Sequence, residues 1–234
     1  MEQFFTPVFL LAVGQIIMID ILLGGDNAVV IALACRKLPD AQRTKGIIWG
    51  TAGAIALRVI LIFFALALLQ VPFLKLIGAV LLLWIGVKLL VPEDDDHSSV
   101  EGSDRLWAAV KTVIVADLVM SIDNVIAIAG AAENVGGDHK LTLVIFGLLV
   151  SIPIIVAGSQ IVIKLMDRFP FVITAGGMLL GWIAGTMAVS DPSIVAYVPG
   201  TDTFRYLCGG LGAVLVLVVG KFFAKRASSS AVQG

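Results

Sequence analysis

Seven apolar segments, each close to or above the length that crosses a lipid bilayer, limit the folds open to this chain. A transmembrane helix needs about 20 apolar residues, and the segments of this kind are 8–34, 46–70, 72–91, 108–132, 140–165, 169–189 and 206–224. Only 14% of the residues are charged, against about 25% in soluble domains. We therefore predict an all-α, polytopic membrane protein with seven transmembrane helices.

The basic residues are distributed unevenly between the two sides of the predicted membrane. Twelve Lys and Arg residues fall on the side of the C-terminus, and three fall on the opposite side. Because cytoplasmic loops carry the excess of positive charge, we expect the N-terminus outside and the C-terminus in the cytoplasm, in a bacterial inner (plasma) membrane. The first apolar segment lacks a basic flank and a cleavage signal, so we expect a retained helix.

An acidic motif occurs twice within these apolar segments. Two aspartates and an asparagine in the first segment recur 97 residues later in the fourth: Asp20, Asp26 and Asn27, then Asp117, Asp123 and Asn124. A carboxylate inside a bilayer costs about 3 kcal/mol or more to keep there. Four carboxylates in duplicate therefore indicate a polar, functional site near the middle of the membrane.

The similarity between the two halves extends beyond the acidic motif. Trp49 corresponds to Phe146 at the same offset of 97, and Trp84 corresponds to Trp182 at an offset of 98. Spans one to three thus repeat as spans four to six, and an odd number of spans inverts the second copy. Inverted repeats are common in transporters, which bind substrate where the halves meet. A duplication kept only for packing would explain the tryptophans but not the repeated polar residues.

The repeat divides the chain into six parts. We predict a first three-helix repeat, an acidic cytoplasmic loop, a second and inverted three-helix repeat, an external loop, a seventh helix and a cytoplasmic tail, at 1–91, 92–107, 108–189, 190–205, 206–224 and 225–234. The acidic run Glu93–Asp96 in the first loop could attract cations. A solvated loop is the favoured interpretation, because charge runs are usually solvated.

The spacing within the motif predicts an interrupted helix. Asp20 and Asp26 would lie about 120° apart on an unbroken helix and would not face one site. Gly24 and Gly25 could break the first helix between them, since broken membrane helices are tolerated where the backbone lines a polar cavity. Ser121 stands at the corresponding place in the second copy, where we expect less distortion and a hydroxyl ligand.

The chemistry of the motif favours a hard divalent cation. Carboxylate and amide oxygens suit Mn²⁺, Mg²⁺ or Ca²⁺, whereas Zn²⁺ or Cu⁺ would favour the imidazole or thiolate groups that the two motifs lack. We predict a metal site made by Asp20, Asp26, Asn27, Asp117, Asp123 and Asn124. Crowded carboxylates also hold protons, which predicts metal–proton exchange. An alternative remains open, that at least two of the four aspartates only fasten broken helices.

One basic residue, Arg58, lies deep within the second span. Two interpretations of it are open. It could pair with one of the aspartates and lower the net charge of the site, or it could extend its side chain to the membrane surface.

The two motifs, Gly24–Ala28 and Ser121–Val125, resemble those of the TerC family of integral membrane proteins, in particular its short bacterial branch of the YjbE type. The resemblance covers the chain through about residue 224. It implies export of Mn²⁺ from the cytoplasm, with the four motif aspartates as the important acidic positions. The family is named for tellurite resistance, so the resemblance also implies a link to tellurium resistance.

We therefore hypothesise a secondary transporter for divalent metal cations, foremost Mn²⁺, with no catalytic residues and no cofactor. Its expected partners are membrane lipid and the metal substrate; nucleic acid is excluded by the lack of a basic stripe, and a homo-oligomer is left open. An intramembrane aspartyl protease is the first alternative, although Leu23 replaces the first glycine of its Gly-x-Gly-Asp signature. A non-transporting membrane assembly factor is the second.

Overall fold

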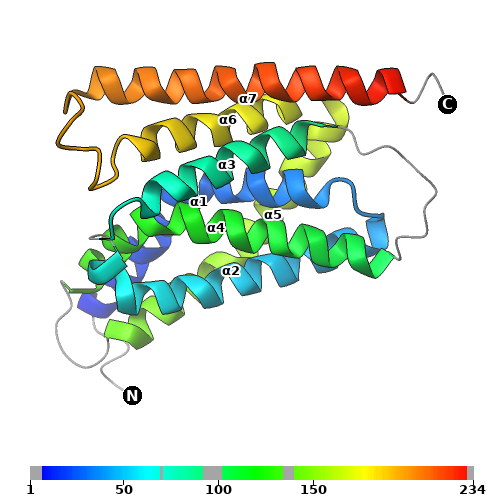
Figure 1. Ribbon diagram of the computed structural model, residues 1–234. Helices are drawn as coiled ribbons and strands as arrows, with labels where there is room; N and C mark the ends of the chain where they lie inside the picture. The colour runs from blue at the N-terminus through cyan, green and yellow to red at the C-terminus, as the bar shows by residue number, and fades with distance from the viewer. Residues whose placement is uncertain (1–6, 69–70, 92–101, 134–139, 231–234) are drawn as a thin grey trace.

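The computed structural model describes residues 7–68, 71–91, 102–133 and 140–230 of the chain. These residues form seven α-helices in the order α1 (Pro7–Cys35), α2 (Asp40–Leu68), α3 (Leu74–Leu90), α4 (Gly102–Glu133), α5 (Lys140–Arg168), α6 (Phe171–Ala188) and α7 (Asp202–Ser230) (Figure 1). The all-helical architecture is confirmed.

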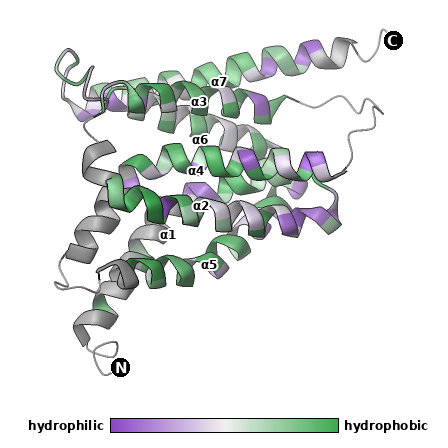
Figure 2. Cartoon of the chain, turned by 60° about the horizontal axis from the view of Figure 1, so that its bottom comes forward, coloured by the Kyte–Doolittle hydropathy of each residue, from purple (hydrophilic) through white to green (hydrophobic). Residues whose placement is uncertain are grey.

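Four helices, within the described residues, contain stretches long and apolar enough to cross a membrane: Asp40–Phe64, Val144–Arg168, Phe171–Ala188 and Asp202–Arg226. Helix α3 has 17 residues and falls just short of the same length. Hydrophobic residues cover most of the helices, and hydrophilic residues gather mainly at the ends on the side where α7 finishes (Figure 2). This distribution fits a membrane-embedded protein.

The helices extend past several predicted boundaries. Helix α4 begins at Gly102, inside the predicted loop 92–107, and α7 runs from Asp202 to Ser230 instead of over 206–224. Both helices carry an acidic residue in the first turn, Asp104 or Asp202, and a negative charge there stabilises the positive end of the helix dipole. Polar residues can therefore prolong a helix beyond its apolar part. The acidic run at 93–96 lies outside the described residues.

The helices pack in two groups. Helices α1, α2, α4 and α5 make their most extensive contacts with one another, and α3, α6 and α7 do the same. Figure 1 shows α7, α6 and α3 on one side of the molecule and α1, α5, α4 and α2 on the other. Fewer contacts join the two groups, and they lie between α3 and α4, between α1 and α6 and between α5 and α6. We call them the four-helix layer and the three-helix layer.

The contact between α6 and α7 brings the two backbones together. A methyl group added at Gly181 would collide with the backbone of Gly212, and one added at Gly185 would collide with the backbone of Cys208. A methyl group at Gly210 would meet nothing. Small residues permit this close approach in membrane helices, where packing and not water exclusion drives association.

Charged side chains from other segments hold both ends of the short helix α3. At its C-terminal end, Arg36 donates to the carbonyl oxygen of Leu89 at 3.0 Å, and Lys37 donates to that of Val91 at 2.9 Å. The last carbonyls of a helix have no partner within the helix. These two contacts therefore tie the turn after α1 to the end of α3.

At the other end of α3, the carboxylate of Asp191 accepts hydrogen bonds from backbone N–H groups. The donors are Phe73 at 3.0 Å, Lys75 at 3.0 Å and Leu76 at 3.2 Å. Phe73 has a φ of 65°, a left-handed conformation that is unfavourable for a bulky residue. Asp191, from the turn after α6, therefore caps α3 and stabilises a strained residue at its start.

Candidate metal site

Both motif helices are continuous. Helix α1 passes through Gly24 and Gly25 without interruption, and α4 passes through Ser121 in the same way. The predicted helix breaks at these residues are therefore wrong. The physical reason is that an unbroken helix satisfies every backbone hydrogen bond internally, which is favourable where no water is available. The glycines have no side chain that would prevent it.

Four of the six predicted ligands have described side chains: Asp26, Asn27, Asp117 and Asn124. Asp20 lies within α1 and Asp123 within α4, but their side chains lie outside the described part of the structure. Among the described residues, no three His, Cys, Asp or Glu side chains come close enough together to hold a metal ion. The full ligand set therefore stays a prediction.

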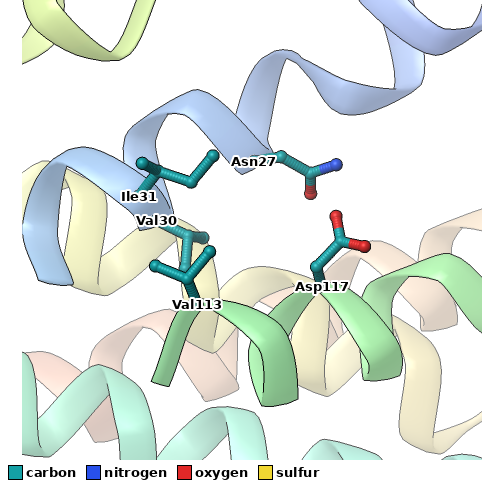
Figure 3. Close-up of a pocket in the computed structure, with 5 residues that line it drawn as sticks. All are labelled: Asn27, Val30, Ile31, Val113 and Asp117. Atoms are coloured by element: carbon teal, nitrogen blue, oxygen red, sulfur yellow. The ribbon is translucent and has the colours of Figure 1, made fainter. Parts of the chain in front are cut away.

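Asn27 and Asp117, one from each copy of the motif, come together at a small cavity. Val30 and Ile31 of α1 and Val113 of α4 complete its lining, and Figure 3 shows the Asn27 amide and the Asp117 carboxylate pointing toward one another. The cavity has a volume of about 10 Å³. That is close to the smallest space that holds one water, so one small ion could also enter.

The Asn27 side chain is buried without a hydrogen bond. It is 3% exposed, and neither its amide oxygen nor its amide nitrogen has a partner within the protein. On the preceding residue, one carboxylate oxygen of Asp26 is also buried without a partner. A buried polar group without a hydrogen bond costs about 1–3 kcal/mol. Such groups are rare in folded proteins and indicate a ligand or a water.

The Asp117 carboxylate is held on its other side by Arg58 of α2. The Nη2 atom of Arg58 lies 2.6 Å from Oδ1 of Asp117, and its Nε donates to the Ser121 hydroxyl at 3.0 Å. That hydroxyl donates to Oδ2 of Asp117 at 3.0 Å. Arg58 is 2% exposed. Of the two interpretations open for Arg58, pairing with an aspartate is confirmed and extension to the membrane surface is wrong.

The structure also shows polar residues that the sequence analysis missed. Thr51 of α2 is 2% exposed, and its hydroxyl oxygen has no hydrogen-bond partner. A threonine in an apolar span attracts little notice, because its hydroxyl usually bonds to its own helix. The sequence gives no sign of membrane function at Asp191, because it follows the sixth apolar segment. Its Asp-Pro-Ser sequence, at 191–193, is typical of a turn and could have indicated a cap.

Comparisons with known proteins agree with the resemblance seen in the motifs. Residues 5–228 match the family described as "Integral membrane protein TerC family". The chain is 40% identical to the "Uncharacterized membrane protein YjbE" of Bacillus subtilis, over 92% of this chain and 96% of the relative. It is 28% identical to the B. subtilis membrane protein YceF, over 81% and 75%.

A more distant relative is the inner membrane protein YgdQ of Escherichia coli, 24% identical over 69% of this chain and 73% of the relative. No solved structure matches the chain. The family match covers nearly the whole chain, including both acidic motifs, helices α1 to α6 and all but the last two residues of α7. The chain therefore belongs to the TerC family of integral membrane proteins.

Proposed function

We propose that this protein is a secondary transporter that exports divalent metal cations from the cytoplasm, foremost Mn²⁺. The observation that carries the proposal is the cavity between Asn27 and Asp117, where a buried amide without hydrogen bonds faces a carboxylate among membrane helices. Amide and carboxylate oxygens are suitable ligands for such ions. Asp26, beside Asn27, offers a further buried oxygen.

The helix contacts support an inverted repeat. If helices α1, α2 and α3 are exchanged for α4, α5 and α6, the contact of α1 with α5 becomes the contact of α4 with α2. Both contacts are among the most extensive in the molecule. The α1–α4, α2–α5 and α3–α6 contacts map onto themselves. This is the pattern that a pseudo-twofold axis produces. The candidate cavity lies between α1 and α4, where such an axis would pass.

The same contacts favour a particular division of moving parts. The two repeats interlock, because α1 packs mainly on α5 and α2 mainly on α4. Rocking one repeat against the other would disrupt these contacts. We propose instead that alternating access moves the four-helix layer, which contains the cavity, against the three-helix layer, where fewer contacts would change.

We propose the orientation that the distribution of basic residues favours, with the C-terminus in the cytoplasm. The relative YgdQ is named as an inner membrane protein, and we propose the same membrane here. A protease is disfavoured, because its dyad needs two facing carboxylates. Among the described side chains, Asp117 instead faces the amide of Asn27 and is paired with Arg58.

Flux into sealed proteoliposomes tests the proposal. Mn²⁺, Mg²⁺, Ca²⁺ and Zn²⁺ are offered in turn, with a pH dye inside that reports whether protons move the opposite way. We expect Mn²⁺ flux in the wild type and its loss in Asp26→Asn, Asp117→Asn and Asp123→Asn. Asp104→Asn is the matched control, since Asp104 is exposed at the start of α4. Wild-type vesicles that move none of the four cations would refute the proposal.

A test in cells addresses direction. A manganese-sensitive host that lacks its own exporter should accumulate less manganese when it makes the wild-type protein. Asp20→Asn and Asp26→Asn should not protect it, whereas Asp104→Asn should. If the motif variants protect the host as well as the wild type, the site is assigned wrongly.

A further inference from the structure

The candidate cavity already has a cation beside it. We infer that Arg58 occupies the carboxylate of Asp117 in place of the transported metal, and that a divalent cation binds by displacing this guanidinium. The inference rests on the proposed function and deepens it, because it assigns an internal competitor to the metal. Arg58 is then a positioning residue that regulates occupancy of the site.

The Asp117 carboxylate lies between two kinds of partner. On one side it accepts a hydrogen bond from Arg58 at 2.6 Å. On the other it lines the cavity that Asn27 faces. Its two oxygens are used by Arg58 and by the Ser121 hydroxyl. A metal that entered the cavity would compete with Arg58 for this carboxylate.

The positive charge of Arg58 weakens the attraction of the Asp117 carboxylate for a metal ion. With Arg58 in place, the Arg58–Asp117 pair has no net charge. It therefore attracts a second cation less strongly than a carboxylate alone would. The pair lies in the membrane part of the bundle, with both side chains less than 10% exposed, where a competing charge is poorly screened. A divalent ion carries twice the charge of a guanidinium. Once it has lost its water, it attracts the carboxylate about twice as strongly as a monovalent ion at the same distance.

Only one half of the sequence has an arginine at this position of the repeat. At the repeat offset of 97, the position equivalent to Arg58 is Ile155 of α5. Ile155 is buried and apolar. An arginine needed simply to neutralise buried carboxylates would be expected in both halves. The presence of an arginine in one half alone fits a role that is specific to Asp117.

The Ser121 hydroxyl helps to hold the Arg58 guanidinium in place. Arg58 Nε donates to the Ser121 hydroxyl at 3.0 Å, so the guanidinium is held by two groups on the same helix. The arginine guanidinium has several N–H donors and can bond to both groups at once, whereas lysine has a single nitrogen. Removing the Ser121 hydroxyl would loosen Arg58 without changing any charge.

Metal binding to the purified protein tests the inference. A pair closed in about nine molecules of ten weakens the apparent affinity about tenfold, because only the open fraction binds metal. We therefore expect Arg58→Gln to lower the Kd for Mn²⁺ about tenfold, measured by calorimetry in detergent micelles. Flux in proteoliposomes should fall in the same variant, because Arg58 no longer helps to expel the bound metal.

Two further variants keep the test decisive. Ser121→Ala should lower the Kd in the same direction but only about threefold, as expected for one lost hydrogen bond, and it answers the question if Arg58→Gln does not fold. Lys88→Gln removes the same charge from an exposed position on α3 that does not line the cavity. It should leave both Kd and flux unchanged.

The outcomes separate the two proposals. If the wild type binds none of the divalent cations, the proposed function fails and this inference with it. If the wild type binds Mn²⁺ but Arg58→Gln and Ser121→Ala bind it equally or more weakly, transport stands and the role given to Arg58 is wrong. A Kd lowered equally by Lys88→Gln would also contradict it, since the effect would then come from net charge alone.

Discussion

The buried carboxylates of Asp117 and Asp191 are stabilised by different kinds of donor. Asp191 accepts hydrogen bonds from the backbone N–H groups of Phe73, Lys75 and Leu76 and from both the N–H and the hydroxyl of Ser193. Every one of these donors is neutral. Asp117 of α4 accepts hydrogen bonds from the charged guanidinium of Arg58 on α2 and from the Ser121 hydroxyl.

The difference separates a fixed carboxylate from an exchangeable one. The donors around Asp191 belong mainly to the backbone at the start of α3, so they cannot leave unless the helix end unwinds. The Arg58 guanidinium, one of the donors to Asp117, is the end of a flexible side chain, and another cation can take its place. One carboxylate therefore maintains the fold, and the other, beside a cavity, is suited to binding a substrate.

The largest effect should come from removing the charge of Asp117. Asp117→Asn removes the carboxylate that lies 2.6 Å from the buried Arg58 guanidinium, and breaking a buried ion pair on one side costs about 3–5 kcal/mol. We expect a marked fall in the thermal unfolding temperature in detergent, with loss of Mn²⁺ binding.

The double variant Asp117→Asn with Arg58→Gln is the control for this prediction. It removes both charges, so it should recover part of the lost stability while Mn²⁺ binding stays absent. Equal unfolding temperatures for the single and double variants would show that Asp117 and Arg58 do not depend on each other.

A smaller effect is expected at Asp191. Asp191→Ala removes the cap of α3, and the loss of a helix cap costs about 0.5–2 kcal/mol. The unfolding temperature should fall, but the Kd for Mn²⁺ should remain that of the wild type. Ser193→Ala, which keeps the carboxylate and removes one of its donors, should lose less stability. A large change in Kd for Asp191→Ala would erase the distinction between the two carboxylates.

The pH dependence of stability isolates the charge of Asp191, which lies outside the membrane spans. Burial alone would raise the pKa of Asp191, but the hydrogen bonds from Ser193, Phe73 and Leu76 outweigh it and lower the pKa from 3.8 to about 2. A depressed pKa in the folded state stabilises the protein above the unfolded-state value. This stability is lost as the pH falls from about 4 to about 2.

Unfolding midpoints of the wild type and of Asp191→Asn, measured across that pH range, check this expectation. The difference between the two proteins should be largest near neutral pH and should shrink steadily below pH 4. A difference that stays constant to pH 2 would mean that the charge of Asp191 contributes nothing.

The smallest effect is expected from Lys75, whose Nζ lies 3.5 Å from the Ser190 hydroxyl in the same region. That distance is at the limit of a hydrogen bond. Lys75→Met keeps the backbone N–H that binds Asp191, so stability should change by less than about 0.5 kcal/mol. A larger loss in the unfolding measurement would show that the side chain, and not only the backbone, supports Asp191.

Helical content and the approximate position of each helix follow from the sequence, with ends that differ by up to six residues. Apolar segments of membrane length permit little else, because every backbone group must be bonded internally in lipid. The ends were less predictable: α7 continues to Ser230 because polar residues can extend a helix into water. The pairing of α1 with α5 and of α2 with α4 depends on side-chain packing, which hydrophobicity alone does not encode.

The candidate site was predictable in its residue types and not in its partners. The repeated motif singled out Asn27 and Asp117, which line one cavity. It did not reveal that Asp117 is paired, since Arg58 is 59 residues away in sequence. The helix breaks were wrong because the presence of glycines shows where a helix can bend but does not require it to. The metal itself stays a prediction.

The backbone contact between α6 and α7 has a consequence for experiments that follow motion. Because Gly181 of α6 and the backbone of Gly212 of α7 touch without a layer of side chains between them, the two helices can hardly slide or rotate against each other. They therefore provide a fixed frame of reference. Spin labels placed one on each of these helices should keep a constant distance in the presence and absence of metal, against which any displacement of a label on α2 can be read.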